Sequence, residues 1–375
     1  MTDSQPNQSH RKYLFALIPL LTILTCGEIG TRVVGSPQCQ AIIPDAGDWD
    51  TMQGDAELLW KLEPNRQFKT GRDLTRINSV GLREALLPTT PKKNNEKRIA
   101  VTGDSSIYGW GVEDTETYAV YLEKLLNQHF NFPIEVINLG VPGYSTEQTL
   151  KLLDKVGWDY QPDLLVVSNI FSDCNIDAFQ DRKAMSLANP EGNFLYRMMR
   201  SSRLYCAMYM PWANFQANLN QSPNRVLMPG MPTGPNAAVT LENINKSLSL
   251  SRVPIATYLD NLSLIQNQAK DRNAHMLLAP LAQEWDVGIW NVPMPPPDKD
   301  HVLPWFPYRE AQAKWASEHN IDIISFPEIF AAYPDPPAKL FVDHMHPSKY
   351  GTYLMAQAVS KHIIAHPELL QGFSK

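Results

Sequence analysis

The sequence predicts an α/β fold, a three-layer α/β/α sandwich around a five-stranded parallel sheet, with a small N-terminal β appendage. Two observations support this. Short apolar runs rich in β-branched residues alternate with amphipathic helical segments, and the runs end in turns rich in Gly, Asn or Asp. Such alternation requires right-handed crossovers between parallel strands, with helices on both faces of the sheet. A chain of 375 residues with 43% hydrophobic content can form one such domain plus an appendage.

The elements follow one another along the chain at the spacing of a doubly wound sheet. A capping box, Ser145-x-x-Gln148, marks the start of the second helix. The predicted strands are residues 99–102, 132–140, 163–171, 274–281 and 321–326. The predicted helices begin at about 115 and then span 145–157, 254–272, 308–319 and 349–364.

The same pattern divides the chain into segments. Residues 178–250 are rich in Asn, Met, Pro and aromatics with little periodicity, so they are predicted to form an insertion over the site. The predicted organisation is a cytoplasmic N-terminus at 1–12, a signal anchor or signal peptide at 13–34, a linker at 35–55, the β appendage at 56–96, and the main domain at 97–370.

Composition excludes several classes of function. The net charge of −6 and the scattered Lys and Arg residues argue against a nucleic-acid partner. The chain has no Walker-type phosphate loop, no paired-cysteine zinc spacing and no Gly-x-Gly-x-x-Gly dinucleotide turn. The sequence therefore predicts no cofactor.

The N-terminus predicts export. Arg11 and Lys12 precede an uncharged apolar run from Tyr13 to Cys26, as in the basic and hydrophobic regions of a signal peptide. The run is shorter than the roughly 20 residues that a comfortable membrane span needs. An uncleaved signal anchor, a cleaved signal peptide and a lipoprotein acylated at Cys26 all remain open, with a soluble core helix as the alternative. Because the basic residues come first, the catalytic domain is expected outside the cytoplasm, in the periplasm or at the cell surface.

The four cysteines are too few for a disulfide scaffold. A Cys174–Cys206 bridge is compatible with an oxidising compartment. Independent buried thiols are an equal alternative.

A serine and a histidine–aspartate pair carry the candidate chemistry. Ser105 lies in the turn after the first strand, at the edge where open α/β sheets place their active sites. Near the other end of the chain, Asp343 and His346 are three positions apart just before a helix. One loop can then present a carboxylate and an imidazole to the same point, which is what activation of a serine requires.

These residues resemble the motifs of the GDSL/SGNH hydrolases. The matching strings are Gly103-Asp-Ser-Ser, Asn138-Leu-Gly140 and Asp343-x-x-His346-Pro, in the family's order and strand contexts. The string Arg76-Ile-Asn-Ser-Val-Gly-Leu-Arg83 is similar to a branch of bacterial SGNH-type proteins with an N-terminal membrane segment. The resemblance covers roughly residues 56–177 and 255–365, and it implies a flavodoxin-like SGNH fold, esterase chemistry and no metal.

The resemblance assigns a role to each matching residue. Ser105 would be the nucleophile and supply one oxyanion amide, His346 would act as general base and then general acid, and Asp343 would orient its imidazole. Gly140 would supply a second oxyanion amide. Asp104 is expected to cap or brace the turn.

One family element departs from the pattern. Ser172 stands where the family has an oxyanion asparagine, and Asn175 is close by in the following loop. An oxyanion donor contributes about 2.7–4 kcal/mol to transition-state stabilisation, so this exchange puts the oxyanion hole in doubt. Three tryptophans, Trp285, Trp290 and Trp305, follow the fourth strand; packing is preferred for them over a sugar-stacking platform.

The sequence thus predicts a membrane-tethered, extracytoplasmic serine esterase that hydrolyses an ester. O-acyl groups on a carbohydrate are the expected substrate, because similar proteins of this layout often serve cell-envelope polysaccharides. One alternative is an O-acyltransferase that uses the same triad on a cell-envelope glycan. A second is a non-catalytic glycan-binding or assembly protein that keeps the fold. The oligomeric state is left open.

Overall fold

The structure is a computed structural model. It describes residues 8–35, 52–55, 57–70, 73–83, 88, 91–175, 180–188, 198, 202–208, 239–240, 251–288, 301–333 and 339–372.

A parallel sheet forms the centre of the molecule. Its strand order is β6-β5-β7-β9, so the chain starts in an inner strand, moves to one edge and then returns past its starting point. All three strand pairs are parallel. Almost every residue of these strands is buried, as expected for a sheet covered on both faces. The strands are β5 (Lys97–Thr102), β6 (Ile134–Asn138), β7 (Leu164–Val167) and β9 (His275–Leu278).

The predicted fifth strand is reduced to a single bridge. Ile323 pairs in parallel with Leu278, and the neighbouring residues exchange two hydrogen bonds with that same leucine. The chain then enters a helix, α12 (Phe326–Ala331), whose N-cap Ser325 accepts a hydrogen bond from Glu328. A serine cap followed by Phe326-Pro-Glu328 is a helix start, and it ends the extended segment before a ladder can form.

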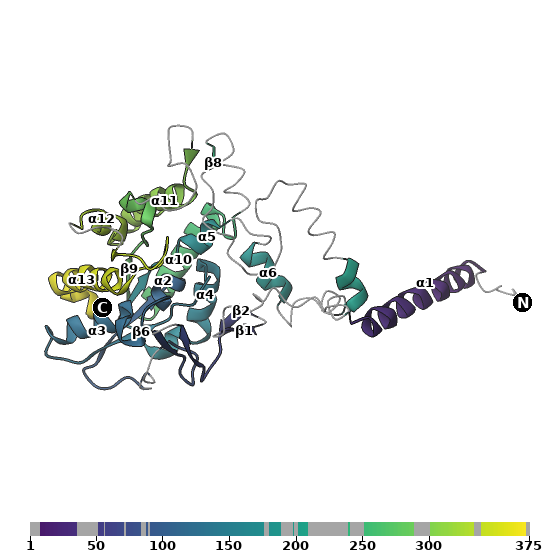
Figure 1. The fold of residues 1–375 in the computed structure, drawn as a ribbon, viewed down its shortest axis with the longest axis horizontal. Helices are drawn as coiled ribbons and strands as arrows, with labels where there is room; N and C mark the ends of the chain where they lie inside the picture. The colour runs from purple at the N-terminus through teal and green to yellow at the C-terminus, as the bar shows by residue number, and fades with distance from the viewer. Residues whose placement is uncertain are drawn as a thin grey trace, which may run out of the picture.

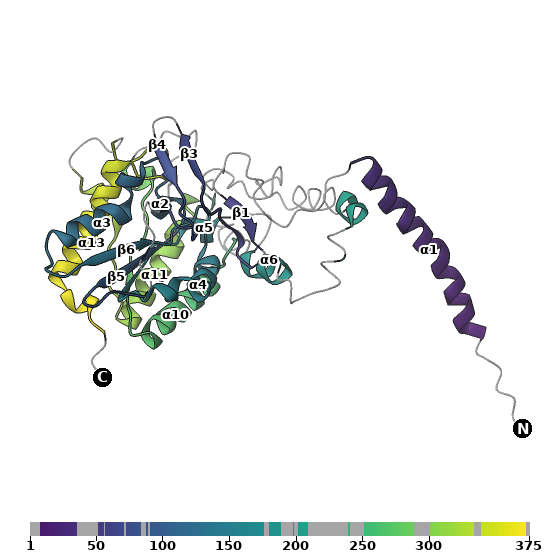
Figure 2. The same cartoon turned by 90° about the horizontal axis from the view of Figure 1, so that it is seen from below.

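Helices cover both faces of the sheet, which confirms the predicted three-layer α/β/α sandwich (Figures 1 and 2). On one face α3 and α13 pack against each other, and on the other α10 packs against α4 and α11. The predicted capping box is present at Ser145 and Gln148. The helices of the sandwich are α3 (Tyr118–Asn127), α4 (Thr146–Lys155), α10 (Ile255–Asp271), α11 (Trp305–His319) and α13 (Lys349–Ala365). Short 3-10 helices lie at Asp114–Glu116, Gly157–Tyr160, Glu284–Val287 and Pro367–Leu370.

The N-terminal appendage consists of two antiparallel hairpins. One pairs β1 (Met52–Asp55) with β2 (Leu59–Leu62), and the other pairs β3 (Gln67–Thr70) with β4 (Asp73–Arg76). The first strand therefore begins inside the stretch predicted as linker. Leu59, Trp60 and Leu62 of β2 belong to the same hydrophobic core as the sandwich. The appendage is thus packed onto the main domain.

The insertion is described in part. It contains α6 (Asp181–Ala188), a helical segment at 203–208 and β8 (Val239–Thr240), which pairs with β10 (His301–Val302). Cys174 is free and buried, whereas Cys206 is disulfide-bonded. The Cys174–Cys206 pairing considered above is therefore wrong, and the expectation of a buried thiol holds for Cys174.

The predicted N-terminal helix is α1 (Gln8–Val33), which projects away from the sandwich (Figures 1 and 2). Near its end, Glu28 accepts hydrogen bonds from the Ser202 hydroxyl at 2.7 Å and from the amides of Arg203 and Leu204. It thereby caps the helical segment at 203–208. Within the described residues, no helix has both the length and the apolar character needed to cross a membrane.

Candidate active site

The turn that carries the predicted nucleophile Ser105, here called the nucleophile turn, lies at the carboxyl end of β5. Asp104 is the N-cap of a four-residue helix, α2 (Ser105–Tyr108), and its side chain accepts a hydrogen bond from the Ser106 amide at 3.0 Å. This is the bracing role expected for Asp104. A Cβ at Gly103 would lie 2.5 Å from the Ile107 side chain, so the tight turn requires glycine there. Ser105 is placed at the first position of the helix.

A continuous hydrogen-bond chain links the three predicted triad residues. The Ser105 Oγ–His346 Nε2 distance is 2.7 Å, and the His346 Nδ1–Asp343 Oδ2 distance is also 2.7 Å. Because a carboxylate only accepts, Nδ1 carries the proton and Nε2 is left to accept from the serine hydroxyl. The arrangement matches that of an activated serine nucleophile.

The loop that presents Asp343 and His346 is closed on itself. Phe341 and Pro347 form an antiparallel bridge across it, and the Val342 amide donates to the His346 carbonyl at 2.9 Å. Inside the loop, the amides of Met345 and His346 donate to Asp343 Oδ1 at 2.9 and 2.8 Å. The carboxylate therefore has both oxygens engaged and a fixed orientation.

These contacts keep Asp343 ionised. Burial alone would raise the pKa of this carboxyl group, but the hydrogen bond and charge of His346 and the two loop amides outweigh it. The net result is an Asp343 pKa well below the ordinary value. A carboxylate that stays charged stabilises the imidazolium form of His346 that general-base catalysis would produce.

The other end of the nucleophile helix is held by the appendage. Arg83 lies buried over the ring of Tyr108, with 4.6 Å from Cζ to the ring centroid. Its guanidinium donates to the carbonyls of Tyr108, at 3.0 Å, and of Gly109, and it lies 3.6 Å from Asp114. Arg76 of the same string pairs with Asp114 at 2.7 Å. The string from Arg76 to Arg83 therefore braces the turn that carries Ser105.

Gly140 does not have a free amide. Its N–H donates to the Asn138 side chain at 2.9 Å, and a Cβ there would lie 2.4 Å from the Tyr108 nitrogen. The sequence prediction of Gly140 as an oxyanion donor therefore conflicts with the structure. Its observed role is close packing of the turn after β6 against α2.

Gly143, three residues further along this turn, was not singled out from the sequence, and its amide is available. Its φ is +75°, and no described residue accepts a hydrogen bond from its amide. The turn lies beside the nucleophile turn, because the Val141 amide donates to the Gly103 carbonyl at 3.2 Å. The signal in the sequence was Pro142-Gly143, a pair typical of a turn with positive φ at the glycine.

Three residues near the end of β7 are candidates for the side-chain oxyanion donor: Ser172, Asn175 and Asn169. Ser172 is buried in α5 (Phe171–Cys174), next to the end of β7, and its hydroxyl has no described hydrogen-bond partner. The main chain of Asn175 is occupied, since its carbonyl accepts from the Arg252 amide at 2.7 Å. The Asn169 side chain is spent as well, on the Tyr144 carbonyl at 3.1 Å and the Thr149 hydroxyl at 3.1 Å. The Ser172 hydroxyl is therefore the predicted donor that the described hydrogen bonds leave open.

The tryptophans are packed as preferred. Trp285 and Trp305 stack on each other at 5.3 Å between ring centroids, and both are buried. Trp290 lies outside the described residues. A different aromatic ring lies beside the triad: Trp110 is 5.8 Å from the His346 ring.

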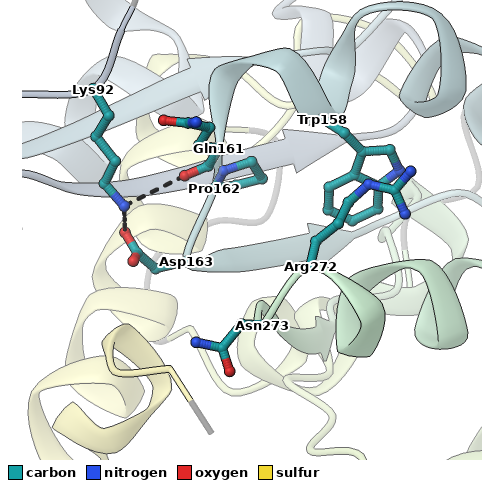
Figure 3. Close-up of a pocket in the computed structure, with 7 residues that line it drawn as sticks. All are labelled: Lys92, Trp158, Gln161, Pro162, Asp163, Arg272 and Asn273. Atoms are coloured by element: carbon teal, nitrogen blue, oxygen red, sulfur yellow. Dashed lines mark hydrogen bonds and ion pairs between the residues drawn. The ribbon is translucent and has the colours of Figure 1, made fainter.

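A cavity of about 460 Å³ lies at the other end of the sheet, where β7 begins (Figure 3). Its charged side chains are paired: Lys92 bonds Asp163, and Arg272 lies 5.0 Å over the Trp158 ring. The cavity is separate from Ser105, because Ser105 lies at the carboxyl end of the strands and the cavity lies at the opposite end. Among the described residues, no group of three or more His, Cys, Asp or Glu side chains is arranged to hold a metal ion.

One buried carboxyl group close to the site is unusual. Asp173 accepts hydrogen bonds from the Thr146 amide at 2.9 Å and the Thr146 hydroxyl, while its Oδ2 has no partner. Burial raises the pKa of Asp173 to about 8, the neighbouring Asp181 charge adds to the rise, and the Thr146 bonds oppose it. Asp173 is therefore protonated in the fold at neutral pH.

Comparison with known proteins identifies the family of the chain. Residues 101–353 match the model of the GDSL-like Lipase/Acylhydrolase family. No curated protein sequence matches the chain.

Several solved structures of lipases and esterases are similar to this chain. A lipase/acylhydrolase from Enterococcus faecalis is 14% identical over 74% of this chain and 100% of its own, with a TM-score of 0.43. Axe2, an acetylxylan esterase from Geobacillus stearothermophilus, is 15% identical over 71% and 94%, with a TM-score of 0.42. The psychrotrophic esterase EstA from Pseudoalteromonas sp. is 12% identical over 72% and 99%, with a TM-score of 0.41.

The pH dependence of stability tests the burial of Asp173. The folded carboxyl keeps its proton up to about pH 8, whereas the ordinary value is 3.8. The folded state therefore binds more protons between these values, and the free energy of unfolding falls as the pH rises through that window. Asp173→Asn, a neutral isostere, should flatten this decline in urea denaturation at pH 5, 6.5 and 8. The exposed control Asp154→Asn should keep the wild-type slope, and equal slopes for Asp173→Asn and wild type would contradict the prediction.

Proposed function

The chain belongs to the GDSL-like Lipase/Acylhydrolase family and is a hydrolase that acts on ester bonds; from this premise we propose that Ser105, His346 and Asp343 are its catalytic triad. The observation that carries the proposal is the unbroken chain of two 2.7 Å contacts from the serine hydroxyl to the carboxylate. The short distances also argue against a non-catalytic protein, which would have no need of an aligned nucleophile, base and carboxylate.

The proposed reaction has two halves. Ser105 Oγ attacks the ester carbonyl carbon as its proton passes to His346 Nε2, giving a tetrahedral oxyanion. This collapses, the C–O bond to the alcohol breaks, and His346 gives its proton to the departing alkoxide oxygen. Water then attacks the acyl-enzyme, loses a proton to His346, and releases the carboxylic acid as Ser105 regains its proton. Asp343 remains ionised and orients the imidazole throughout.

We place three donors around the oxyanion. Two are main-chain amides: that of Ser105, at the N-terminus of α2, and that of Gly143, which takes the role first expected of Gly140. The third is the Ser172 hydroxyl, which lies on the other side of β5 because β7 and β6 flank that strand. Donors fixed by the fold before reaction are the effective ones, because they need no reorganisation as charge develops.

The proposed substrate is a small acyl ester on a carbohydrate. This class rests on the resemblance to bacterial proteins of the same layout. Family membership supports hydrolysis over transfer to a glycan acceptor. Trp110 supplies apolar surface beside His346 for the acyl group.

We also propose a location outside the cytoplasm, attached to a membrane through α1. The disulfide at Cys206 supports an oxidising compartment. Along α1, apolar side chains such as Leu21 and Ile23 are more than half exposed, and a membrane would cover them.

Labelling with a fluorophosphonate probe tests the triad. The probe phosphonylates an activated serine, so full-length wild type should be labelled and should release acetate from an acetylated oligosaccharide. Ser105→Ala should lose both. His346→Ala should lower kcat by about 10⁴-fold or more, since the members of a triad act as a unit. Ser106→Ala is the matched control and should label normally. Equal labelling of wild type and Ser105→Ala would refute the triad.

A pair of variants separates the two predicted side-chain donors. Ser172→Ala should lower kcat by about 10-fold with little change in KM, a smaller effect than the 10²–10³-fold loss typical of an amide donor. Asn175→Ala should leave kcat near wild type, because the proposed oxyanion hole takes its side-chain donor from Ser172. The reverse result, a loss confined to Asn175→Ala, would assign the donor to that residue instead.

The redox state of the cysteines tests the location. In protein taken from cells, unfolded without reductant and alkylated, Cys206 should be blocked, whereas Cys26 and Cys174 should react. Mass spectrometry reads out each site, and fractionation should place the chain with membranes. A reduced Cys206 in a cytosolic fraction would rule out export.

A further inference from the structure

Two residues from outside the parallel sheet donate hydrogen bonds to the turn that carries Gly143. Trp60 belongs to β2 of the appendage, and Arg252 follows directly after the insertion, where it pairs with Asp181 of the insertion. We propose that both are positioning residues, which fix the Gly143 amide in the direction needed for an oxyanion donor. The inference rests on the proposed esterase function and assigns the positioning of one oxyanion donor to the appendage and to the segment that follows the insertion.

Trp60 holds the peptide unit that contains the Gly143 amide. Its indole Nε1 donates to the Pro142 carbonyl at 2.9 Å. That carbonyl and the Gly143 N–H belong to one planar peptide group, so fixing the oxygen also fixes the direction of the N–H. The Tyr144 hydroxyl donates back to the Trp60 carbonyl at 2.6 Å, which ties the two segments at a second point.

The ring of Trp60 also sets the shape of the turn. A Cβ at Gly143 would lie 3.2 Å from Trp60 Cζ2, and the φ of +75° at this glycine disfavours other residues as well. The turn therefore rests directly on the indole. Trp60 is 3% exposed, so its hydrogen bond is shielded from competition by water.

Arg252 holds the next peptide unit. Its Nη1 donates to the Gly143 carbonyl at 2.8 Å. The guanidinium is itself held by Asp181, at 2.8 Å from Nε and 2.7 Å from Nη2, and by Gln148 at 2.8 Å. It also lies 5.4 Å over the Trp60 ring. Both ions of the pair are buried, with side-chain exposures of 5% and 0%, so the guanidinium has a fixed position.

The peptide planes on both sides of the Gly143 Cα are thus anchored by separate parts of the chain. Fixing two planes defines both backbone dihedrals of the residue between them. The amide is then aimed before substrate arrives, which is the condition for strong oxyanion stabilisation.

Trp60→Phe tests the proposal, because it removes the indole donor and keeps an aromatic ring. Trp158→Phe is the matched control, since Trp158 is also buried and donates one hydrogen bond, to Gln268 at 2.8 Å. Each full-length variant is assayed with p-nitrophenyl acetate. It is also titrated with an aryl trifluoromethyl ketone, which adds to the serine as an anionic tetrahedral adduct.

We expect Trp60→Phe to lower kcat by about 10- to 100-fold with KM nearly unchanged, somewhat less than the loss of a whole donor. The ketone Ki should rise by the same factor, because the adduct uses the same oxyanion donors. Trp158→Phe should change neither. Loss of packing alone would lower the urea midpoint without this matched change in kcat and Ki.

Wild-type kcat and Ki in folded Trp60→Phe would overturn the inference while leaving the esterase proposal intact. If Trp60→Phe does not fold, Arg252→Lys replaces it, with the same expected pattern of kcat and Ki and the same overturning result. Absence of Ser105-dependent turnover in wild type would instead defeat the proposed function, and this inference with it.

Discussion

The hydrogen bond between Ser105 and His346 joins residues 241 positions apart, and much of the fold serves to hold it. Parallel strands bring their carboxyl ends to one edge, so the turn after β5 lies where loops from distant parts of the chain meet. The loop from Phe341 to Pro347 is closed by its own bridge, which lets it present Asp343 and His346 as a unit. The Ser105–His346 contact therefore depends both on the strand order, which places the turn after β5, and on the closed loop, which presents His346.

The structure braces the site from the periphery with buried cations. Arg83 satisfies carbonyls at the end of the nucleophile helix, and Arg252 satisfies the Gly143 carbonyl. A buried ion pair such as Arg252–Asp181 adds little net stability, because desolvation of both ions offsets their attraction. Removing one partner would nevertheless leave an unpaired buried charge. The pair is therefore better understood as fixing one conformation of the turn than as a source of stability.

The sequence predicted that Ser105, Asp343 and His346 would meet, and the structure brings the three side chains into contact. Ser105 follows a buried strand and Asp343 and His346 share one loop, so strand context, spacing and the family resemblance were enough to predict this contact. The predicted role of Gly140 as an oxyanion donor conflicts with the structure because its amide donates to the Asn138 side chain. This contact depends on side-chain conformation and has no sequence signature. The predicted fifth strand is reduced to a single bridge because the helix cap at Ser325 ends the extended segment early.

The contacts of the appendage with the sandwich were beyond prediction for the same reason. The pattern of the appendage indicated strands, and its β hairpins are present, but nothing in it indicated that Trp60 would reach Pro142. The string from Arg76 to Arg83 was recognised as a motif without a physical role. Its role became apparent once Arg83 was placed against the carbonyls of Tyr108 and Gly109.

The exchange of asparagine for Ser172 changes how the proposed oxyanion hole must work. A hydroxyl offers one rotatable donor where an amide side chain offers two donors in a fixed plane, so Ser172 brings less preorganisation. More of the stabilisation then falls on the main-chain amides of Ser105 and Gly143, which no side-chain change can retune directly. Main-chain donors are only as well aimed as the segments around them. A site of this kind depends on Trp60, Arg83 and Arg252 more than one with an asparagine donor would, which gives a physical reason for the appendage to be packed against the catalytic turn.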